Sequence, residues 1–304
     1  MRLRAGIIGD GKIAKVHARI YAELDISLVA VLFSNEKSAL EFSVKSGELL
    51  DIRPKPFHVM DEFLSINLDL ISVCSPPKFH YDQILNSFNY NIPVFCEKPL
   101  LDISSLNNDE LKLQLKNIKN HKNRFLLLNT SNTVFVDLIL NSIKGKLIFD
   151  KIRFEFYTNG LYHNKAIGLD LLPHGFSILV HILKEQKIQN FNFKISEKKF
   201  ECNFIYGSTN IEFDFREDIN GPKHMLFNFD GDEFVRQQSG FGESYEVSLL
   251  HTNLKQIINC EDPFRSFIEK FSKKIINKYK EDDFSNAEAI TKLSAYSMNI
   301  INKT

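Results

Sequence analysis

The chain begins with a short apolar segment that ends in two closely spaced glycines, and this feature constrains the fold more than any other. Residues 5–8 are predicted as a buried strand, and Gly9-Asp10-Gly11-Lys12-Ile13-Ala14 follows directly. Gly9 permits a tight turn, Gly11 lets the backbone approach phosphate oxygens, and Ala14 is small enough for a helix to pack on the strand. The helix that follows would direct its first amide groups toward an anion. The pattern predicts a site for the pyrophosphate of a dinucleotide.

Strand and helix patterns alternate over the first 130 residues. The apolar, β-branched and aromatic segments are predicted as strands over residues 5–8, 28–33, 68–74, 92–96 and 125–128. The segments with helical spacing of apolar residues are 12–24, 37–46, 80–88 and 109–119. Short connections and strands that are apolar on both faces predict a doubly wound parallel sheet with helices on both sides.

The pattern changes in the second half of the chain. Residues 151–156 and 210–215 alternate apolar with charged side chains, which is typical of antiparallel strands with one solvated face. Further strands are predicted at 191–195, 200–206 and 225–230, and two helices at 263–278 and 286–302 close the chain. We therefore expect two domains, residues 1–129 and 130–304.

Composition excludes several classes of partner. The chain has 304 residues, of which 43% are hydrophobic, so it can bury a sizeable core. Its 38 basic and 38 acidic side chains balance, which indicates small-molecule partners and neither nucleic acid nor membrane. No apolar run approaches the roughly 18 residues that span a bilayer, and the four cysteines contain no CxxC pair. A cytoplasmic protein without disulfides and without a metal site is expected.

Two further places carry reactive side chains. The strand at 92–96 ends in Glu97-Lys98-Pro99, and ligands of parallel sheets bind at that edge. Asp170 and His174 are four residues apart and would share one face of a helix near its start. Taken singly, the first pair is also typical of a surface ion pair, and the second of a helix cap with a buried histidine.

Together these residues resemble the Gfo/Idh/MocA family of nicotinamide-dependent oxidoreductases, over nearly the whole chain. The resemblance rests on the turn at 9–14, on Ser75-Pro76-Pro77 with His80, on Glu97-Lys98-Pro99, and on Asp170 with His174. It implies an α/β protein with an N-terminal Rossmann domain and a C-terminal α+β domain whose sheet is open and mostly antiparallel. It also implies a homodimer or homotetramer built on that sheet, whose aromatic face would otherwise be exposed.

The resemblance implies a bound NAD or NADP. The cofactor-binding residues are then expected among Gly9, Asp10, Gly11, Lys12, Ile13, Ser34, Asn35, Lys37, Ser75, Pro76, His80, Glu97 and Lys98. The second strand ends in Phe33-Ser34, without the carboxylate that holds a ribose 2′-hydroxyl, so NADPH is expected to bind at least as well as NADH.

The catalytic residues implied are Lys98, Asp170 and His174. His174 suits proton exchange near neutral pH and Lys98 suits stabilisation of an alkoxide, and the residues themselves leave open whether these roles are exchanged. The substrate-binding residues expected are Lys98, Asn159, Tyr162, Asp170 and His174. The implied activity is hydride transfer at a CH–OH carbon of a sugar or polyol, including a sugar phosphate or nucleotide sugar. The alternatives are a glycosidase that uses bound nicotinamide, a non-catalytic dinucleotide- or sugar-binding protein, and a structural protein.

Two segments depart from the family pattern. Ser177 stands where an acid often follows the histidine, and Asn129-Thr130-Ser131-Asn132 replaces a segment that usually bears an arginine. Substrate contacts are therefore expected to differ from those of well-known members.

Overall fold

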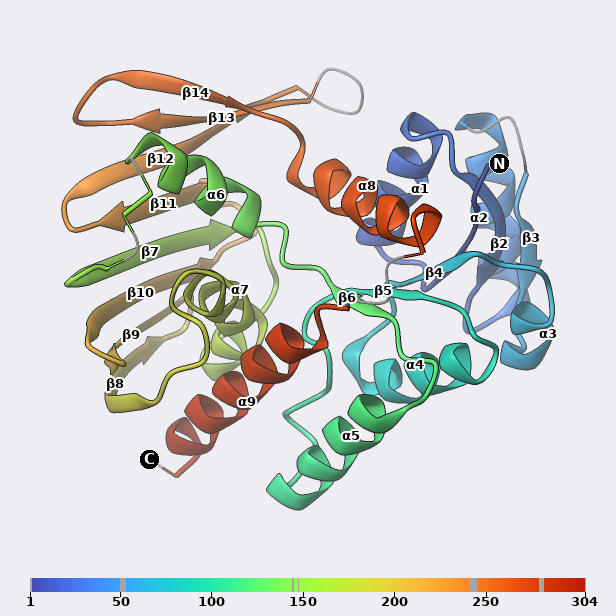
Figure 1. Ribbon diagram of the computed structural model, residues 1–304, viewed down its shortest axis with the longest axis horizontal. Coiled ribbons are helices and arrows are strands. Elements are labelled where there is room, and N and C mark those ends of the chain that lie inside the picture. The colour runs from blue at the N-terminus through green and yellow to red at the C-terminus, as the bar shows by residue number, and fades with distance from the viewer. Residues whose placement is uncertain are drawn as a thin grey trace. The chain divides into compact units, whose positions relative to one another are not determined.

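The computed structural model describes residues 2–49, 53–143, 145–146, 148–240, 245–278 and 282–303. The chain divides into two compact units, Met1–Asn129 with Phe264–Ala287, and Thr130–Pro263 with Glu288–Thr304 (Figure 1). The expected division at residues 129 and 130 differs from this in one segment, because residues 264–287 return to the first unit. The Phe271 ring packs there, 5.7 Å from Phe95 and 5.8 Å from Phe125 between ring centroids.

The first unit contains a six-stranded sheet in the order β3-β2-β1-β4-β5-β6, and every pairing in it is parallel. The strands are β1 (Arg4–Ile8), β2 (Ser27–Leu32), β3 (Lys55–Phe57), β4 (Leu70–Val73), β5 (Val94–Cys96) and β6 (Leu126–Leu128). The helices of this unit are α1 (Lys12–Glu23), α2 (Glu36–Leu49), α3 (Met60–Leu64), α4 (His80–Asn89), α5 (Asn108–Asn120) and α8 (Pro263–Ile276), with a short 3₁₀ helix, η1 (Pro77–Phe79).

The strand order reverses between β1 and β4, and open parallel sheets bind ligands at such a point. β4, β5 and β6 are buried along their whole length, as the sequence predicts for strands covered by helices on both faces. The predicted doubly wound sheet is confirmed. The sequence did not predict β3, a three-residue edge strand that contains Pro56, because so short a segment carries no periodicity.

The second unit contains an eight-stranded sheet in the order β14-β13-β12-β11-β7-β10-β9-β8. Its strands are β7 (Lys151–Thr158), β8 (Ile188–Ser196), β9 (Lys199–Tyr206), β10 (Thr209–Glu217), β11 (His224–Phe229), β12 (Asp232–Ser239), β13 (Glu246–His251) and β14 (Gln256–Cys260). Only the central pair β7 and β10 is parallel among the described strands. The expected mostly antiparallel sheet is confirmed.

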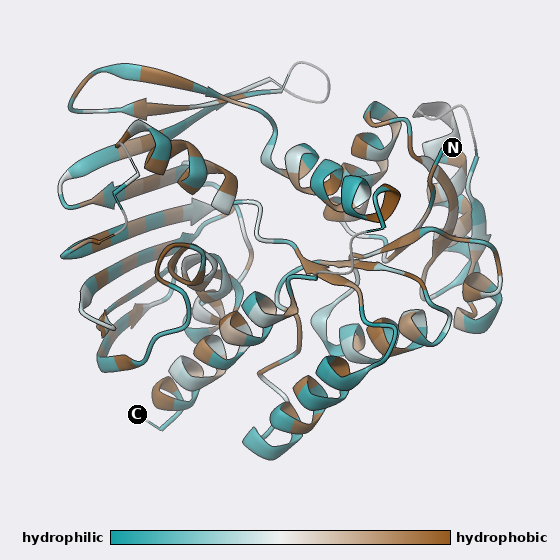
Figure 2. Ribbon diagram, viewed as in Figure 1, coloured by the Kyte–Doolittle hydropathy of each residue, from teal (hydrophilic) through white to brown (hydrophobic). Residues whose placement is uncertain are grey.

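Helix α7 (Lys165–Leu183) packs on one face of this sheet, which we call the inner face. Its Phe176 ring lies 5.9 Å from both Phe204 and Phe213. Gly175 is required at this crossing, because a Cβ atom there would lie 2.6 Å from the Phe213 ring. The alternating colours along these strands in Figure 2 show the same two-sided pattern. Most of the aromatic side chains of the sheet are thus covered within the unit, so an exposed aromatic face does not provide the reason for a dimer.

Helix α7 also corrects an expectation about apolar runs. Its 19 residues are long and apolar enough to cross a membrane by length and composition, and it is alone in this among the described helices. Because 67% of its most apolar window is buried inside the protein, the helix has the burial of a core helix. The unit also holds α6 (Thr133–Ser142), and α9 (Phe284–Ile301) runs from the first unit into the second.

Candidate active site

In the turn between β1 and α1, the backbone at Gly9 lies very close to the backbone at Cys74 and Ser75. Gly9 has φ of +108°, and a Cβ atom on it would lie 2.7 Å from the carbonyl carbon of Cys74 and from the nitrogen of Ser75. Only glycine meets both demands. Gly11 precedes the first helical residue, Lys12, and the first turn of α1 contains no acidic residue. The amide groups of this helix end therefore meet no acidic side chain of their own first turn that would compete for them.

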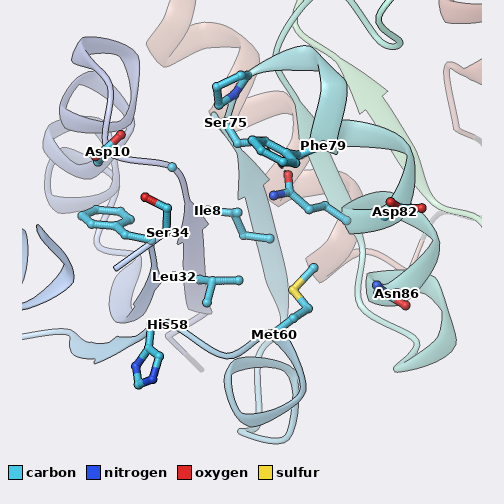
Figure 3. Close-up of a pocket in the computed structure, with 14 residues that line it drawn as sticks. Ile8, Asp10, Leu32, Ser34, His58, Met60, Ser75, Phe79, Asp82 and Asn86 are labelled. Carbon is cyan, nitrogen blue, oxygen red and sulfur yellow. Dashed lines mark hydrogen bonds between the residues drawn. The ribbon is translucent and has the colours of Figure 1, made fainter. Parts of the chain in front are cut away.

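A cavity of about 400 Å³ lies at the switch point of the sheet (Figure 3). Its apolar walls are supplied by β1, β2 and the segments around α3 and η1, and Ile8, Leu32, Met60 and Phe79 border the same space. Its polar lining comes mainly from the strand ends and α4. The complete lining is Ile8, Gly9, Asp10, Leu32, Phe33, Ser34, His58, Met60, Ser75, Pro76, Phe79, Asp82, Gln83 and Asn86.

The structure brings some of the predicted cofactor residues together around this cavity. Gly9, Asp10, Ser34, Ser75 and Pro76 line it. The other predicted residues lie outside its lining, namely Gly11, Lys12, Ile13, Asn35, Lys37, His80, Glu97 and Lys98. The sequence did not predict the contributions of His58, Met60 and Phe79, since their segments gave no strong pattern. The position of Phe79 directly before His80 was the one available signal.

A second cavity, of about 350 Å³, lies between α1 and α2 and shares Asp10 and Phe33 with the first. Lys15, Ser38 and Lys45 supply hydrogen-bond donors to it, and Asp10 and Glu41 supply carboxylates. The complete lining is Asp10, Lys15, Ala18, Phe33, Ser38, Glu41, Phe42, Lys45 and Ser46.

Two residues expected near the ribose have other positions. The side-chain oxygen of Asn35 accepts a hydrogen bond of 2.8 Å from the Ser38 amide, so it caps the first turn of α2. Lys37 is exposed and lines neither cavity. The lysines that line the second cavity are Lys15 and Lys45.

These features fit a dinucleotide. A Cβ atom on Gly11 would meet nothing within 4 Å, so the backbone there is open to a phosphate group, and the α1 amides supply donors. The larger cavity is apolar enough for a purine and opens at Ser34, where an adenosine ribose would lie. Nicotinamide chemistry, when such a cofactor is bound, is reversible hydride transfer.

A buried polar network lies beneath the strand end that carries Lys98. His17 of α1 is fully buried, with Nδ1 2.9 Å from Ser72 Oγ and Nε2 2.9 Å from Glu97 Oε1. Asn129 donates to the same Glu97 oxygen at 2.7 Å. Glu97 is 8% exposed, so the interpretation of Glu97-Lys98 as a surface ion pair is wrong for the carboxylate. The carboxylate points inward and fixes the turn from which the half-buried Lys98 projects.

His80 connects two loops of the same unit. Its ring is buried, with Nδ1 2.9 Å from the Pro99 carbonyl oxygen and Nε2 2.8 Å from the Ser75 carbonyl oxygen. Burial lowers the pKa of His80 below its ordinary value, and the two carbonyl contacts oppose this shift. His80 therefore holds the loop after β4 against the turn that follows Lys98, and it acts by positioning rather than by lining the cavity.

Asp170 and His174 lie in the second unit, one helical turn apart on α7. Asp170 is the sixth residue of that helix, so the interpretation of Asp170 as a helix cap is wrong. His174 is half-buried, and its ring meets the Phe156 ring edge-on with centroids 5.0 Å apart. Asn132, which the sequence analysis did not include in the site, places its amide nitrogen 3.2 Å from His174 Nδ1.

The two remaining predicted substrate residues have different surroundings. The Asn159 amide donates to the carbonyl oxygens of Asp218, Ile219 and Gly221, so it holds that loop in place. Tyr162 is 53% exposed, and its backbone amide donates to Glu217 at 2.9 Å. The Tyr162 side chain remains accessible to a ligand, whereas the donors of Asn159 are already used.

Comparison with known proteins agrees with this architecture. Residues 3–126 match the model of the Gfo/Idh/MocA oxidoreductase family, described as an NAD-binding Rossmann fold. The solved structure of UDP-N-acetylglucosamine 3-dehydrogenase from Acidithiobacillus ferrooxidans superposes with a TM-score of 0.73 at 16% identity, covering 99% of this chain and 97% of that one. At this identity the likeness establishes the fold of both units, and the family match confirms the predicted resemblance over residues 3–126.

Two curated relatives match parts of the chain. D-glucoside 3-dehydrogenase of Escherichia coli strain K12 is 38% identical over 99 residues, which are 32% of this chain and 27% of that protein. Oxidoreductase P35 of Formosa agariphila is 26% identical over 205 residues, which are 60% of this chain and 61% of that protein. The chain thus spans less than two thirds of the length of either relative.

Proposed function

We propose that this chain, whose residues 3–126 match the Gfo/Idh/MocA family of oxidoreductases, catalyses reversible hydride transfer between a nicotinamide cofactor and a CH–OH carbon of a sugar or polyol. The observation that carries the proposal is the combination, in one chain, of three parts. These are a cavity at the switch point of the parallel sheet, Lys98 on a turn fixed by the buried Glu97, and the pair Asp170 and His174 on α7.

In this proposal one side chain stabilises the developing charge and another transfers the proton. Lys98 supplies a positive charge to the reacting oxygen and stabilises the alkoxide character that develops on it. His174 exchanges the proton of that hydroxyl, and Asp170, one turn away, orients the ring or a neighbouring substrate hydroxyl. Asn132 and Phe156 restrict the orientation of the imidazole.

The activity is tested by incubating the protein with NAD⁺ or NADP⁺ and a panel of sugars and polyols while nicotinamide absorbance is followed. Lys98→Ala and His174→Ala should each lower turnover about 10²-fold or more and leave cofactor affinity nearly unchanged. Release of sugar from a glycoside without net change in absorbance would indicate the glycosidase instead. Near-normal turnover in both variants would contradict the proposed site.

We further propose that the smaller cavity receives the 2′-phosphate of NADP. The end of β2 offers Phe33 and Ser34 rather than a carboxylate, so nothing there favours a free 2′-hydroxyl. Lys15, Lys45 and Ser38 would donate to the phosphate, while the carboxylates of Asp10 and Glu41 would oppose it. NADPH is then bound at least as well as NADH.

Binding constants for both cofactors test this proposal. Replacing Lys15 and Lys45 together by Ala should weaken NADPH binding about a hundredfold or more, since each of the two charge-assisted hydrogen bonds contributes about 1.5 to 3 kcal/mol, and should leave NADH binding unchanged. Glu41→Gln should have the opposite effect and strengthen NADPH binding. Lys37→Ala is the matched control, because that exposed lysine lines neither cavity. Wild-type protein that binds NADH ten times more tightly than NADPH would exclude the proposal.

A further inference from the structure

Arg236 lies on β12 and faces the inner side of the second sheet. Phe227 of β11 pairs with Phe234, and Arg236 pairs with Leu249 of β13, which is fully buried. Residues 234 and 236 share one face because strand side chains alternate. Arg236 is therefore on the same face as the aromatic core, and not on the solvated face that the other arginines of the sheet occupy.

The guanidinium of Arg236 is half-buried without a carboxylate. Burial lowers its pKa from the ordinary arginine value, and the charge interaction with Tyr245 opposes this shift only in part. Within the described part of the chain, no ion pair or hydrogen bond links Arg236 to an acidic side chain. An arginine keeps its charge at all ordinary pH values, so desolvation without an anion costs folding free energy.

The other sheet arginines provide the contrast. On the outer face, Arg153 forms an ion pair with Glu155, and Arg216 contacts Asp214 at 3.2 Å. Among the residues that the structure describes, carboxylates thus pair with the partly solvated arginines of the outer face, and none pairs with Arg236, whose charge is more desolvated. Structural arginines are ordinarily paired when buried, whereas a desolvated, unpaired cation is typical of a ligand site.

The position of Arg236 connects it to the candidate catalytic histidine. Its guanidinium carbon lies 5.9 Å from the centre of the Phe156 ring, and the same ring contacts His174 with centroids 5.0 Å apart and planes at 88°. Phe156 thus separates two polar groups that border one region of the inner face. A ligand of sugar size that reaches His174 can extend past Phe156 to Arg236.

We propose that Arg236 binds an oxyanion group, a carboxylate or a phosphate, carried by the sugar-like substrate. This inference rests on the proposed function for the identity of the reacting group, and on the geometry of β7, β12 and α7 for the anion. The planar guanidinium donates two parallel hydrogen bonds to either oxyanion, which Lys could not reproduce. The substrate class is then an acidic sugar, such as a uronate or a sugar phosphate, rather than a neutral glycoside.

The test compares matched ligands in wild type and in Arg236→Gln and Arg236→Lys. The probes are D-glucuronate and D-glucose 6-phosphate, which distinguish the two oxyanions, with D-glucose and methyl glucoside as neutral partners. Binding is measured by calorimetry in the presence of NADPH, and turnover by nicotinamide absorbance in the presence of NADP⁺. Arg216→Gln on the outer face is the control variant.

Wild type should bind at least one acidic probe ten times or more tightly than its neutral partner. Arg236→Gln should weaken the binding of that acidic probe about ten- to hundredfold, which appears in turnover chiefly as a higher KM. Binding of the neutral probes should stay unchanged. Arg236→Lys should restore part of the loss, and Arg216→Gln should behave as wild type. The comparison of acidic with neutral probes in wild type does not require any variant to fold.

Two outcomes separate this inference from the proposed function. Turnover of neutral sugars, with no preference for acidic probes and no effect of Arg236→Gln, overturns the anion site and leaves the oxidoreductase intact. Binding of an acidic probe that depends on Arg236, with no turnover of any sugar, overturns the oxidoreductase and leaves the anion site. Equal weakening of neutral and acidic probes in Arg236→Gln shows a structural role and also overturns the inference.

Discussion

At the scale of single residues, the contact between Asn132 and His174 sets the protonation of the imidazole. An amide nitrogen only donates, so His174 Nδ1 accepts over the 3.2 Å between them, and a neutral ring carries its proton on Nε2. Asn132→Asp should reverse this assignment, because a carboxylate accepts from Nδ1–H. Nitrogen NMR of His174 should show the proton move from Nε2 to Nδ1.

The same substitution has a kinetic consequence. A nearby carboxylate stabilises imidazolium, so the acid limb of the pH profile for substrate oxidation should move to higher pH by about one unit. Asn132→Leu removes the contact without adding charge, so the acid limb of the pH profile should stay at its wild-type pH. An unchanged tautomer in Asn132→Asp would contradict the assignment.

The sequence predicted part of the site and not the rest. The spacing of Asp170 and His174 places them on one helix face, but it was the resemblance to the family motif that marked them as catalytic. Asn132 was noted only as part of the segment 129–132 that departs from the family pattern, because one more asparagine in a chain rich in asparagine carries no signal of its own. His17 was not predicted, because a lone histidine within a helical pattern is ordinarily a core residue, and its partner Glu97 is 80 positions away in sequence.

At the scale of elements, His80 joins the loop after β4 to the turn after β5. Its lowered pKa means that the unfolded chain binds a proton near pH 6.5 that the folded chain binds only at lower pH. The stability that His80 contributes is therefore present above pH 6.5 and is lost as the pH falls below it, by at most about 1.4 kcal/mol per pH unit.

His80→Gln tests this contribution. The glutamine has no proton to gain, so the free energy of unfolding, measured by denaturant titration from pH 7 to pH 5, should fall less steeply than in wild type. His163→Gln is the control, since His163 is exposed and lines neither cavity. A wild-type slope equal to that of His80→Gln would show that His80 does not titrate in this range.

Elements were predictable where length and periodicity were strong. The strands of the parallel sheet other than β3, and the alternating strands β7 and β10, follow from apolar runs and period-two patterns. The sequence did not predict β12, β13 and β14, although Asp230-Gly231, both with positive φ, is a hairpin signal directly before β12. It did not predict α6 either, whose β-branched, apolar sequence is equally typical of a strand. Because β12 was not predicted, Arg236 on that strand was not predicted as a site residue.

At the scale of the whole molecule, the outer face of the eight-stranded sheet carries an apolar row. Leu226 pairs with Val235, Val235 with Leu250, and Leu250 with Ile257, so these four side chains cross β11 to β14 side by side. In the same row beyond β11 lie Glu155 of β7 and its charged neighbours. A face that is half apolar and half charged suits contact with a second copy about a twofold axis.

We therefore expect a homodimer through this outer face, with a mass twice the 35.2 kDa of one chain by light scattering at micromolar concentration. Ile257 is 59% exposed and lies in the apolar row, whereas Leu254, 67% exposed, lies in the turn between β13 and β14. Because both side chains are solvated in one chain, Lys at either position should leave the fold intact. Ile257→Lys should shift the population to monomer by burying an unpaired charge in the interface, and Leu254→Lys should not. A monomeric wild type, or equal dimer fractions in the two variants, would exclude the outer face as the interface.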